Sequence, residues 1–149
     1  MTYREETRDL FTVPEGCCLA QCISADLAMG KGIAVAFNRH FDMKRRLRQR
    51  CPNYREEYAA RGTGGDCILE GRVLNLVTKE RYFQKPTLSS MEAALREMRA
   101  VCRREEIRRV AMPRIGAGLD RLPWEDVSAL IKAVFAGMDI EILVCSLEP

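Results

Sequence analysis

The second half of the chain alternates segments of helical character with segments of strand character. From 88 to 102, apolar residues recur three or four positions apart, which predicts one buried face of a helix. Residues 123–138 repeat the pattern and predict a second amphipathic helix. The runs RRVAMP (108–113) and IEILVCSL (140–147) follow these helices and are typical of buried strands. Because strands here alternate with helices, we expect these strands to be parallel and joined by right-handed crossovers.

The first half supplies the elements that complete a sheet. In chain order, we expect strands at 2–7 and 18–23, a helix opening at Gly32, and short helices at 43–50 and 53–60. The apolar runs 67–70 and 72–78 flank Gly71, which predicts a β-hairpin and makes the sheet mixed. Helices from successive crossovers cover both faces of such a sheet. The predicted fold class is therefore α/β, a three-layer α/β/α domain with a mixed central sheet.

Length and composition agree with one globular domain. The chain has 149 residues, of which 47% are hydrophobic and 30% are charged. It shows no internal repeat, low-complexity tract or linker, so we expect a single domain over 1–149. The net charge of +3 permits a nucleic-acid partner without requiring one. A monomer is the default expectation for such a chain.

The chain shows no sign of export or membrane insertion. The first residues, MTYREETRDL, are charged and lack the apolar core of a signal peptide. No apolar run approaches the roughly 20 residues of a membrane span, so we expect no membrane partner. The seven cysteines include no CxxC pair, which favours free thiols in a reducing compartment. The expected location is the cytoplasm, with the nucleus as the alternative in a eukaryote.

A single histidine, His40, narrows the chemistry open to this chain. A metal site would have to be built from cysteines and carboxylates that lack the usual ligand spacing. A Ser-His-Asp triad could use only His40, whose surroundings, NRHFDMKRR, resemble a helix end. We therefore interpret His40 as a surface residue and expect neither a metal nor a cofactor.

Two glycine-containing loops follow apolar strands and precede helices. They are CISADLAMGKGIA (22–34) and MPRIGAGLD (112–120). Ligands of α/β folds bind at the carboxyl ends of strands, where such loops lie. Glycine lets the backbone approach a ligand, and a helix N-terminus favours an anion. Neither loop matches a known nucleotide fingerprint, and glycine turns without function are common. Two equivalent loops in one fold nevertheless favour a diphosphate-containing ligand.

Two reactive side chains accompany these loops. Asp120 could simply favour the start of the next helix, but Glu125 and Asp126 already place negative charge in its first turn. A role in the site is therefore the better interpretation of Asp120. Lys79 directly follows an apolar strand and, taken alone, is typical of a strand end on a solvated edge. It gains a functional interpretation only if Asp120 faces it.

The motifs resemble those of macrodomains, and among them the terminal ADP-ribose protein glycohydrolase subgroup. The stretches that carry the resemblance are RDLF (8–11), CISADLAMGKGIAVAF (22–37), LVTKERYFQKPT (76–87) and MPRIGAGLDRLPWEDVSALI (112–131). They occur in the family's order and cover nearly the whole chain. The most specific is PRIGAGLDRLPW, because other macrodomains share its glycines but usually lack its aspartate.

The resemblance implies an ADP-ribose site and the residues that form it. Asp9 matches the aspartate that contacts the adenine amino group, and Leu10 matches its neighbour on the ring. The residues that match the loop around the distal ribose and diphosphate are Ser24, Gly30, Gly32 and Ile33. The residues that match the second phosphate-binding loop are Arg114, Ile115, Gly116, Ala117, Gly118 and Leu119. Near the end of the last strand, where the family often has an aromatic residue, this chain has Cys145.

The resemblance also implies an activity, with Lys79 as the nucleophile and Asp120 as the acid/base. ADP-ribose linked through its terminal ribose can present an aldehyde when that ring opens, and a lysine amine can add to it. Asp120 can take a proton from Lys79 and later activate water. The implied substrates are mono-ADP-ribose on acidic side chains or nucleobases, and O-acyl-ADP-ribose. The implied partners are thus ADP-ribose and a mono-ADP-ribosylated protein or nucleic acid.

Two alternatives remain open at this point. The chain could be a reader that binds ADP-ribose without turnover, although a reader needs no Lys79–Asp120 pair. It could also act on nucleic acid, as a DNA-directed de-ADP-ribosylating antitoxin. The run KRRLRQR (44–50) could follow phosphates, or it could be a solvated helix face beside the acidic segment REEY. The run has no interleaved aromatic residues on which bases could stack.

Overall fold

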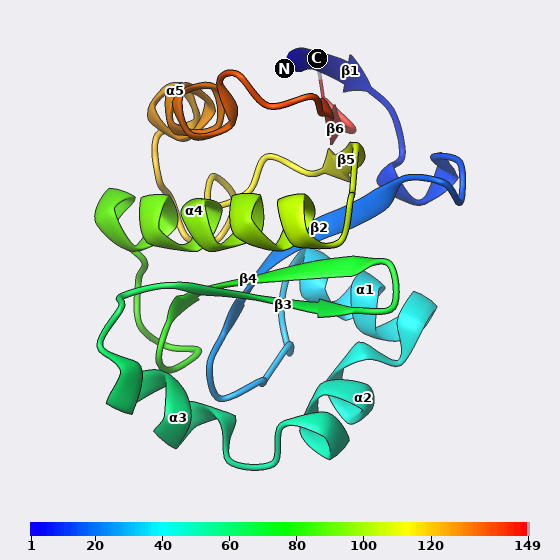
Figure 1. The fold of residues 1–149 in the computed structure, drawn as a ribbon. Coiled ribbons are helices and arrows are strands. Elements are labelled where there is room, and N and C mark those ends of the chain that lie inside the picture. Colours follow the sequence, from blue (N-terminus) through cyan, green and yellow to red (C-terminus); the bar gives the residue numbers. More distant parts are fainter. Residues whose placement is uncertain (149) are drawn as a thin grey trace.

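The computed structural model describes residues 1–148 and contains a six-stranded mixed sheet flanked by helices (Figure 1). The strands are β1 (Thr2–Thr7), β2 (Cys18–Ser24), β3 (Asp66–Glu70), β4 (Val73–Lys79), β5 (Arg109–Met112) and β6 (Glu141–Ser146). The helices are the 3-10 turn η1 (Leu10–Thr12), α1 (Ile33–Phe41), α2 (Met43–Arg50), α3 (Tyr54–Arg61), α4 (Leu88–Arg104) and α5 (Trp124–Phe135). Each expected element is present within a few residues of its predicted bounds.

The strand order is β1-β6-β5-β2-β4-β3. All neighbouring strands are parallel except β3 and β4, which form the predicted antiparallel hairpin around Gly71. Gly71 has a φ of +59°, a left-handed conformation that glycine adopts without strain. The parallel crossovers place the carboxyl ends of β2, β4 and β5 at the same edge of the sheet. This edge is where the two glycine-containing loops begin.

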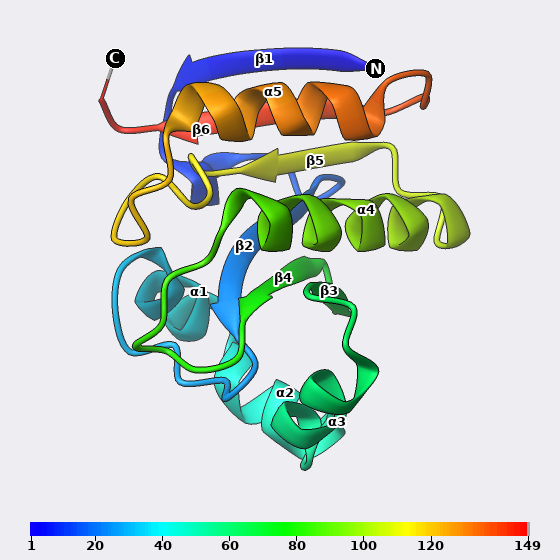
Figure 2. The same ribbon diagram turned by 90° about the vertical axis from the view of Figure 1, so that its left-hand side faces the viewer.

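Two apolar cores lie on the two faces of the sheet. Along β4, Leu74 and Leu76 pack into the core that includes α4 and α5, whereas Val73 and Val77 pack into the core that includes α1 and α2. This alternation follows from the two-residue period of a strand. Figures 1 and 2 show α4 and α5 along one side of the sheet and α1 and α2 on the other. The predicted three-layer arrangement with a mixed sheet is confirmed.

A buried polar pair crosses the middle of the sheet. Gln21 of β2 and Asn75 of β4 are both fully buried, and Gln21 Nε2 donates to Asn75 Oδ1 at 2.9 Å. Asn75 Nδ2 in turn donates to the Ile68 carbonyl of β3 at 3.1 Å. A register shift would leave these buried groups unpaired, so the pair favours one alignment of the three strands.

The predicted surface position of His40 is confirmed, with one addition. His40 is exposed, but its ring stacks on Phe11 with the ring centroids 4.2 Å apart. All seven cysteines are free thiols, as their spacing predicts. Within residues 1–148, no helix has both the length and the apolar character needed to cross a bilayer.

Gly65 allows the start of β3 to pack directly on α4, and this contact gives a test of the fold. A Cβ at position 65 would lie 2.5 Å from the backbone nitrogen of Ala94 and 2.8 Å from the carbonyl oxygen of Ser90. We expect Gly65→Ala to lower the free energy of unfolding by about 1–3 kcal/mol, measured by urea denaturation, because backbone atoms must move apart. Gly16→Ala is the control, since its Cβ would meet nothing within 4 Å. Equal stability of the two variants would contradict this packing.

Candidate active site

Lys79 and Asp120 form an ion pair at the carboxyl edge of the sheet. Lys79 Nζ donates to Asp120 Oδ1 at 2.8 Å, although the residues are 41 positions apart in sequence. The two side chains are only 14% and 18% exposed. Water and salt therefore screen the interaction less than they screen a surface pair. From the sequence, Lys79 has a functional interpretation only if Asp120 faces it, and this ion pair shows that it does.

The sheet fixes where the amine of Lys79 lies. Lys79 is the last residue of β4 and stands opposite Ser24 in the parallel β2–β4 pairing. Its carbonyl oxygen accepts a hydrogen bond from the backbone nitrogen of Ala25 at 2.9 Å. Asp120 belongs to the loop after β5, on the other side of β2 in the strand order. The ion pair therefore spans the carboxyl end of β2.

Asp26 organises the loop that follows β2. Its Oδ1 accepts hydrogen bonds from Ser24 Oγ at 2.5 Å and from the backbone nitrogen of Ala28 at 3.2 Å. Its Oδ2 accepts from the backbone nitrogen of Tyr82 at 2.8 Å. One carboxylate thus joins the loop after β2 to the loop after β4. Sequence analysis did not single out Asp26, because its most distant partner is 56 residues away.

The loop after β5 is held by its own backbone. Leu122 N donates to the Gly116 carbonyl at 2.7 Å, and Ala117 N donates to the Arg114 carbonyl at 3.2 Å. Gly116 has a φ of +74°, and a Cβ there would lie 2.7 Å from Met91 Cε of α4. Gly116 therefore serves the fold through both its conformation and the close approach of α4. Ala117 lies partly exposed on the same turn.

The two loops touch each other. A Cβ on Gly32, which precedes α1 with a φ of +63°, would lie 3.2 Å from Leu119 Cδ1. Lys85 Nζ donates to the Leu119 carbonyl at 2.8 Å, so the loop after β4 also contacts this position. A Cβ on Gly30 or Gly118 would meet nothing within 4 Å. Neither of these glycines has a positive φ. No packing contact in the described part of the chain explains why Gly30 and Gly118 lack a side chain.

Arg114 is held beside an acidic side chain of β1. Arg114 Nη2 lies 3.9 Å from Glu5 Oε1, and the buried Arg114 Nε has no hydrogen-bond partner among the described residues. Glu5 also accepts from Trp124 Nε1 at 3.3 Å and from the Tyr3 hydroxyl at 2.8 Å. Burial raises the pKa of Tyr3 to about 12, so its hydroxyl stays protonated and can donate. Sequence analysis did not identify this cluster, since it joins β1 to the start of α5.

Asp9 lies at the same edge, just beyond the carboxyl end of β1. It is exposed and caps η1, with Oδ1 accepting from the backbone nitrogen of Phe11 at 3.0 Å. Arg8 N donates to the Ser146 carbonyl at 2.8 Å, so Asp9 lies close to the end of β6. Asp9 can therefore contact a ligand that extends across the edge from Lys79.

Two of the predicted binding residues are buried in the cores. Leu10 is 4% exposed and Ile115 is 2% exposed, so both side chains pack in the apolar cores and leave almost no surface open to a ligand. The match of Leu10 to the family residue beside the adenine ring stays a prediction, and any contact with a ligand would have to come from the little surface that Leu10 exposes. Ile33 and Leu119 are, by contrast, 42% and 59% exposed. The structure thus gathers the predicted residues at one edge, but only some of them present side chains to solvent.

Cys22 lies next to the ion pair without the properties of a nucleophile. Burial is the main cause that raises the pKa of its thiol, and the Asp120 carboxylate adds to the effect while Lys79 opposes it. The thiol is therefore protonated at neutral pH, and the thiolate is the reactive form of cysteine. Within residues 1–148, no three His, Cys, Asp or Glu side chains are placed to hold a metal ion. The reactive groups at this edge are an amine and a carboxylate.

Comparisons with known proteins agree with this architecture. The family model of the Macro domain matches residues 22–131. The chain is 39% identical to ADP-ribose glycohydrolase OARD1 of Homo sapiens over 142 residues, which cover 93% of this chain and 88% of that protein. It is 29% identical over 110 residues to DNA ADP-ribosyl glycohydrolase of Mycobacterium tuberculosis, covering 72% of this chain and 31% of that protein.

A solved structure shows the same fold. The macrodomain of Mycobacterium tuberculosis DarG superposes with a TM-score of 0.75 over 97% of each chain, at 24% sequence identity. At that identity the likeness concerns the fold alone. The family model and the OARD1 match cover most of the chain and confirm the resemblance carried by its motifs. The chain belongs to the macrodomain family.

Proposed function

We propose that this chain is an ADP-ribosyl hydrolase that cleaves the bond between the distal ribose of ADP-ribose and an acceptor group. The observation that carries the proposal is the ion pair of Lys79 and Asp120, 2.8 Å apart where two glycine-containing loops meet. The name of the relative OARD1, an ADP-ribose glycohydrolase, supports the reaction class. The proposed substrates are mono-ADP-ribose on acidic side chains or nucleobases, and O-acyl-ADP-ribose.

The ligand would lie along the carboxyl edge of the sheet. Asp9 stands at the β1 end of this edge, with one carboxylate oxygen accepting from Phe11 N and the other able to accept from the adenine amino group. The diphosphate would lie between the loops of Gly30 and Gly118. Backbone N–H groups and the N-terminus of α1 favour an anion there. The distal ribose would then reach Lys79.

The first chemical step needs a neutral amine. Asp120 takes a proton from Lys79 Nζ along their 2.8 Å hydrogen bond. The amine then forms a bond to the anomeric carbon of the distal ribose. The bond from that carbon to the acceptor breaks, and an acidic acceptor leaves as a carboxylate with the bonding electron pair. The nitrogen then loses a proton to solvent, and the bond between the anomeric carbon and the ring oxygen breaks as that oxygen takes the proton held by Asp120. The result is a ring-opened, imine-type adduct between Lys79 and ADP-ribose, with Asp120 again a carboxylate.

The second step releases ADP-ribose. Water adds to the same carbon while a carboxylate at Asp120 accepts one of its protons. Asp120 returns that proton to the Lys79 nitrogen, the bond between carbon and nitrogen breaks as the aldehyde carbonyl forms, and the proton of the new hydroxyl group passes to the departing amine. Each residue returns to its starting protonation state, and one water molecule is consumed for each ADP-ribose released. The two side chains thus suffice for the chemistry that we propose.

A reader that only binds ADP-ribose is the alternative of a different class. Such a reader gains nothing from a partly buried lysine paired with a carboxylate, because removing charges from water carries a cost. The glycine-containing loops alone could hold a diphosphate. The Lys79–Asp120 pair therefore favours the enzyme.

Kinetic variants of the ion pair test the proposal. On a peptide carrying ADP-ribose on glutamate, we expect Lys79→Ala to lower kcat by about 100-fold or more, because the nucleophile is lost. Asp120→Asn should lower kcat to a similar degree, since the amide cannot accept the proton. Isothermal titration calorimetry with ADP-ribose should show that both variants still bind, because both leave the glycines and the backbone N–H groups of the two loops unchanged.

Lys85→Ala is the matched control for the loss of a lysine. Lys85 follows the same strand but donates to the Leu119 carbonyl, so its removal should loosen the loop and change KM more than kcat. Full activity of Lys79→Ala would contradict the proposed chemistry. Full loss of activity in all three variants, together with lost ADP-ribose binding, would instead assign Lys79 to binding.

The glycines that no packing contact explains give a separate test of the ligand's position. Gly30→Ala and Gly118→Ala should keep the free energy of unfolding of the original chain, since each Cβ enters open space. They should weaken ADP-ribose binding by about tenfold or more, equivalent to about 1.4 kcal/mol, because the added methyl occupies the ligand's path. Calorimetry and urea denaturation measure the two effects. Gly16→Ala is the control, and unchanged affinity in both loop variants would place the diphosphate elsewhere.

A further inference from the structure

The loop after β4 exposes two aromatic side chains a few residues beyond Lys79. Tyr82 and Phe83 are 60% and 65% exposed, and their rings meet edge to face with centroids 5.5 Å apart. The backbone of Tyr82 is tied to Asp26, so this part of the loop is anchored beside the site. Two large apolar rings left in water on a fixed loop indicate a surface that contacts a partner.

The cations of α2 are not equivalent. Three of the five are neutralised within the chain, since Arg45 pairs with Asp42 at 2.5 Å, and Arg46 and Arg50 pair with Glu70 at 2.9 and 3.1 Å. The other two cations are Lys44 and Arg48. In the part of the chain that the structure describes, neither has a carboxylate partner within 4.0 Å.

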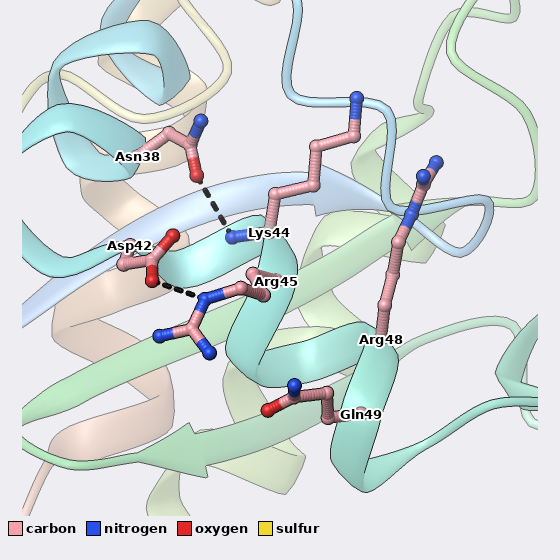
Figure 3. Close-up of a pocket in the computed structure, with 6 residues that line it drawn as sticks. All are labelled: Asn38, Asp42, Lys44, Arg45, Arg48 and Gln49. Carbon is pink, nitrogen blue, oxygen red and sulfur yellow. Dashed lines mark hydrogen bonds and ion pairs between the residues drawn. The ribbon is translucent and has the colours of Figure 1, made fainter.

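The two unpaired cations extend from the same side of their helix. Figure 3 shows Lys44 and Arg48 extending alongside each other, while Arg45 turns to Asp42. They line a shallow hollow together with Asn38 of α1. Their charge is therefore available to an anion that lies across α1 and α2.

A short segment after β2 connects the cations to the aromatic pair. Arg48 lines a second hollow of about 310 Å³ that Asp26 and Leu27 line as well. Asp26 also holds the backbone of Tyr82 at 2.8 Å. The rim of the site thus runs from Lys44 and Arg48, past Asp26, to Tyr82 and on to Lys79. Glu56 and Arg55, which also line the hollow, are paired with each other at 3.7 Å.

We propose that this rim binds a single-stranded nucleic acid, with bases stacked on Tyr82 and Phe83 and phosphates beside Lys44 and Arg48. The proposal rests on the proposed function, because it assigns the strand that flanks an ADP-ribosylated base in the same site. Stacking on exposed rings requires unpaired bases, which a single strand offers and a duplex does not. An acidic peptide would match the cations, but it has no groups that repeatedly stack on the rings.

The position of the aromatic pair fits the acceptor side of the reaction. ADP-ribose would extend from Lys79 toward Gly30 and Asp9, so the acceptor has to leave on the remaining open side. Tyr82 and Phe83 follow Lys79 on the same loop and are exposed. They contact the acceptor and not the ADP-ribose moiety. They are therefore specificity-determining residues and take no part in the bond-breaking steps.

Binding of a short fluorescein-labelled oligothymidylate, followed by anisotropy over a series of salt concentrations, tests the surface without any hydrolysis. Tyr82→Ser/Phe83→Ser should weaken binding about fivefold or more, the low end of what one stacked base contributes. Tyr82→Phe/Phe83→Tyr should restore binding, because it keeps both rings. Lys44→Gln/Arg48→Gln should reduce the slope of log affinity against log salt by about 1.4, as expected for two lost contacts to single-strand phosphates.

Arg104→Gln/Arg108→Gln is the matched charge control. Both arginines are exposed and precede β5, at the edge of the sheet opposite to the site. This variant should keep the salt slope of the original chain. An equal fall in slope would mean that binding of the oligonucleotide depends only on the net charge of the protein, and it would overturn the proposal. Unchanged affinity of the serine variant would overturn it as well.

A hydrolysis comparison separates this inference from the proposed function. The serine variant should slow release of ADP-ribose from a modified oligonucleotide about fivefold or more and leave turnover of O-acyl-ADP-ribose unchanged. Equal slowing with an ADP-ribosylated glutamate peptide would assign the surface to protein acceptors and overturn the nucleic-acid assignment. If the original chain does not hydrolyse O-acyl-ADP-ribose, the proposed function is contradicted. The anisotropy measurement would still decide whether the rim binds a single strand.

Discussion

The ion pair of Lys79 and Asp120 is the contact on which the proposed site depends. It joins the end of β4 to the loop after β5, and β2 lies between these two strands in the sheet. The parallel order of the strands places both side chains at one edge, and their partial burial keeps the charges from being screened. Loss of either partner would leave the other charge partly buried and unpaired. The pair thus couples the position of the amine to the position of the loop.

Three further contacts fix the positions of the surrounding loops relative to the ion pair. Asp26 joins the loop after β2 to the backbone of Tyr82, and Lys85 joins the loop after β4 to the Leu119 carbonyl. Glu5 contacts Trp124 directly and lies beside Arg114 on the other flank. Each contact joins segments that are far apart in sequence. The site is therefore built from loops whose relative positions the sheet and a few polar side chains determine together.

Local sequence patterns predicted most of the fold because each pattern reports a local physical preference. The apolar spacing in 88–102 predicted α4, and Gly71 between two apolar runs predicted the β3–β4 hairpin. The two loops were found from their glycines and from their place after strands. The condition that Lys79 be paired with Asp120 came from the chemistry of the two groups. The structure shows that contact, while the roles of the residues stay proposals.

The remaining features depend on contacts that no local pattern encodes. Leu10 and Ile115 are buried because η1 and the loop after β5 pack onto the cores, and no local pattern shows this burial. The basic run 44–50 looked uniform in sequence, yet Glu70 from β3 neutralises two of its arginines. Only the folded chain shows that Lys44 and Arg48 are the two cations of this run that have no acidic partner among the described residues.

Trapping the covalent adduct tests the proposed role of Lys79 most directly. The protein would be incubated with a glutamate-linked ADP-ribosyl peptide and cyanoborohydride, then digested and analysed by mass spectrometry. Reduction converts an imine to a stable amine, so we expect ADP-ribose to remain attached to the peptide containing Lys79. Rapid release of ADP-ribose with no adduct on Lys79, or an adduct on Lys85 instead, would contradict Lys79 as the nucleophile.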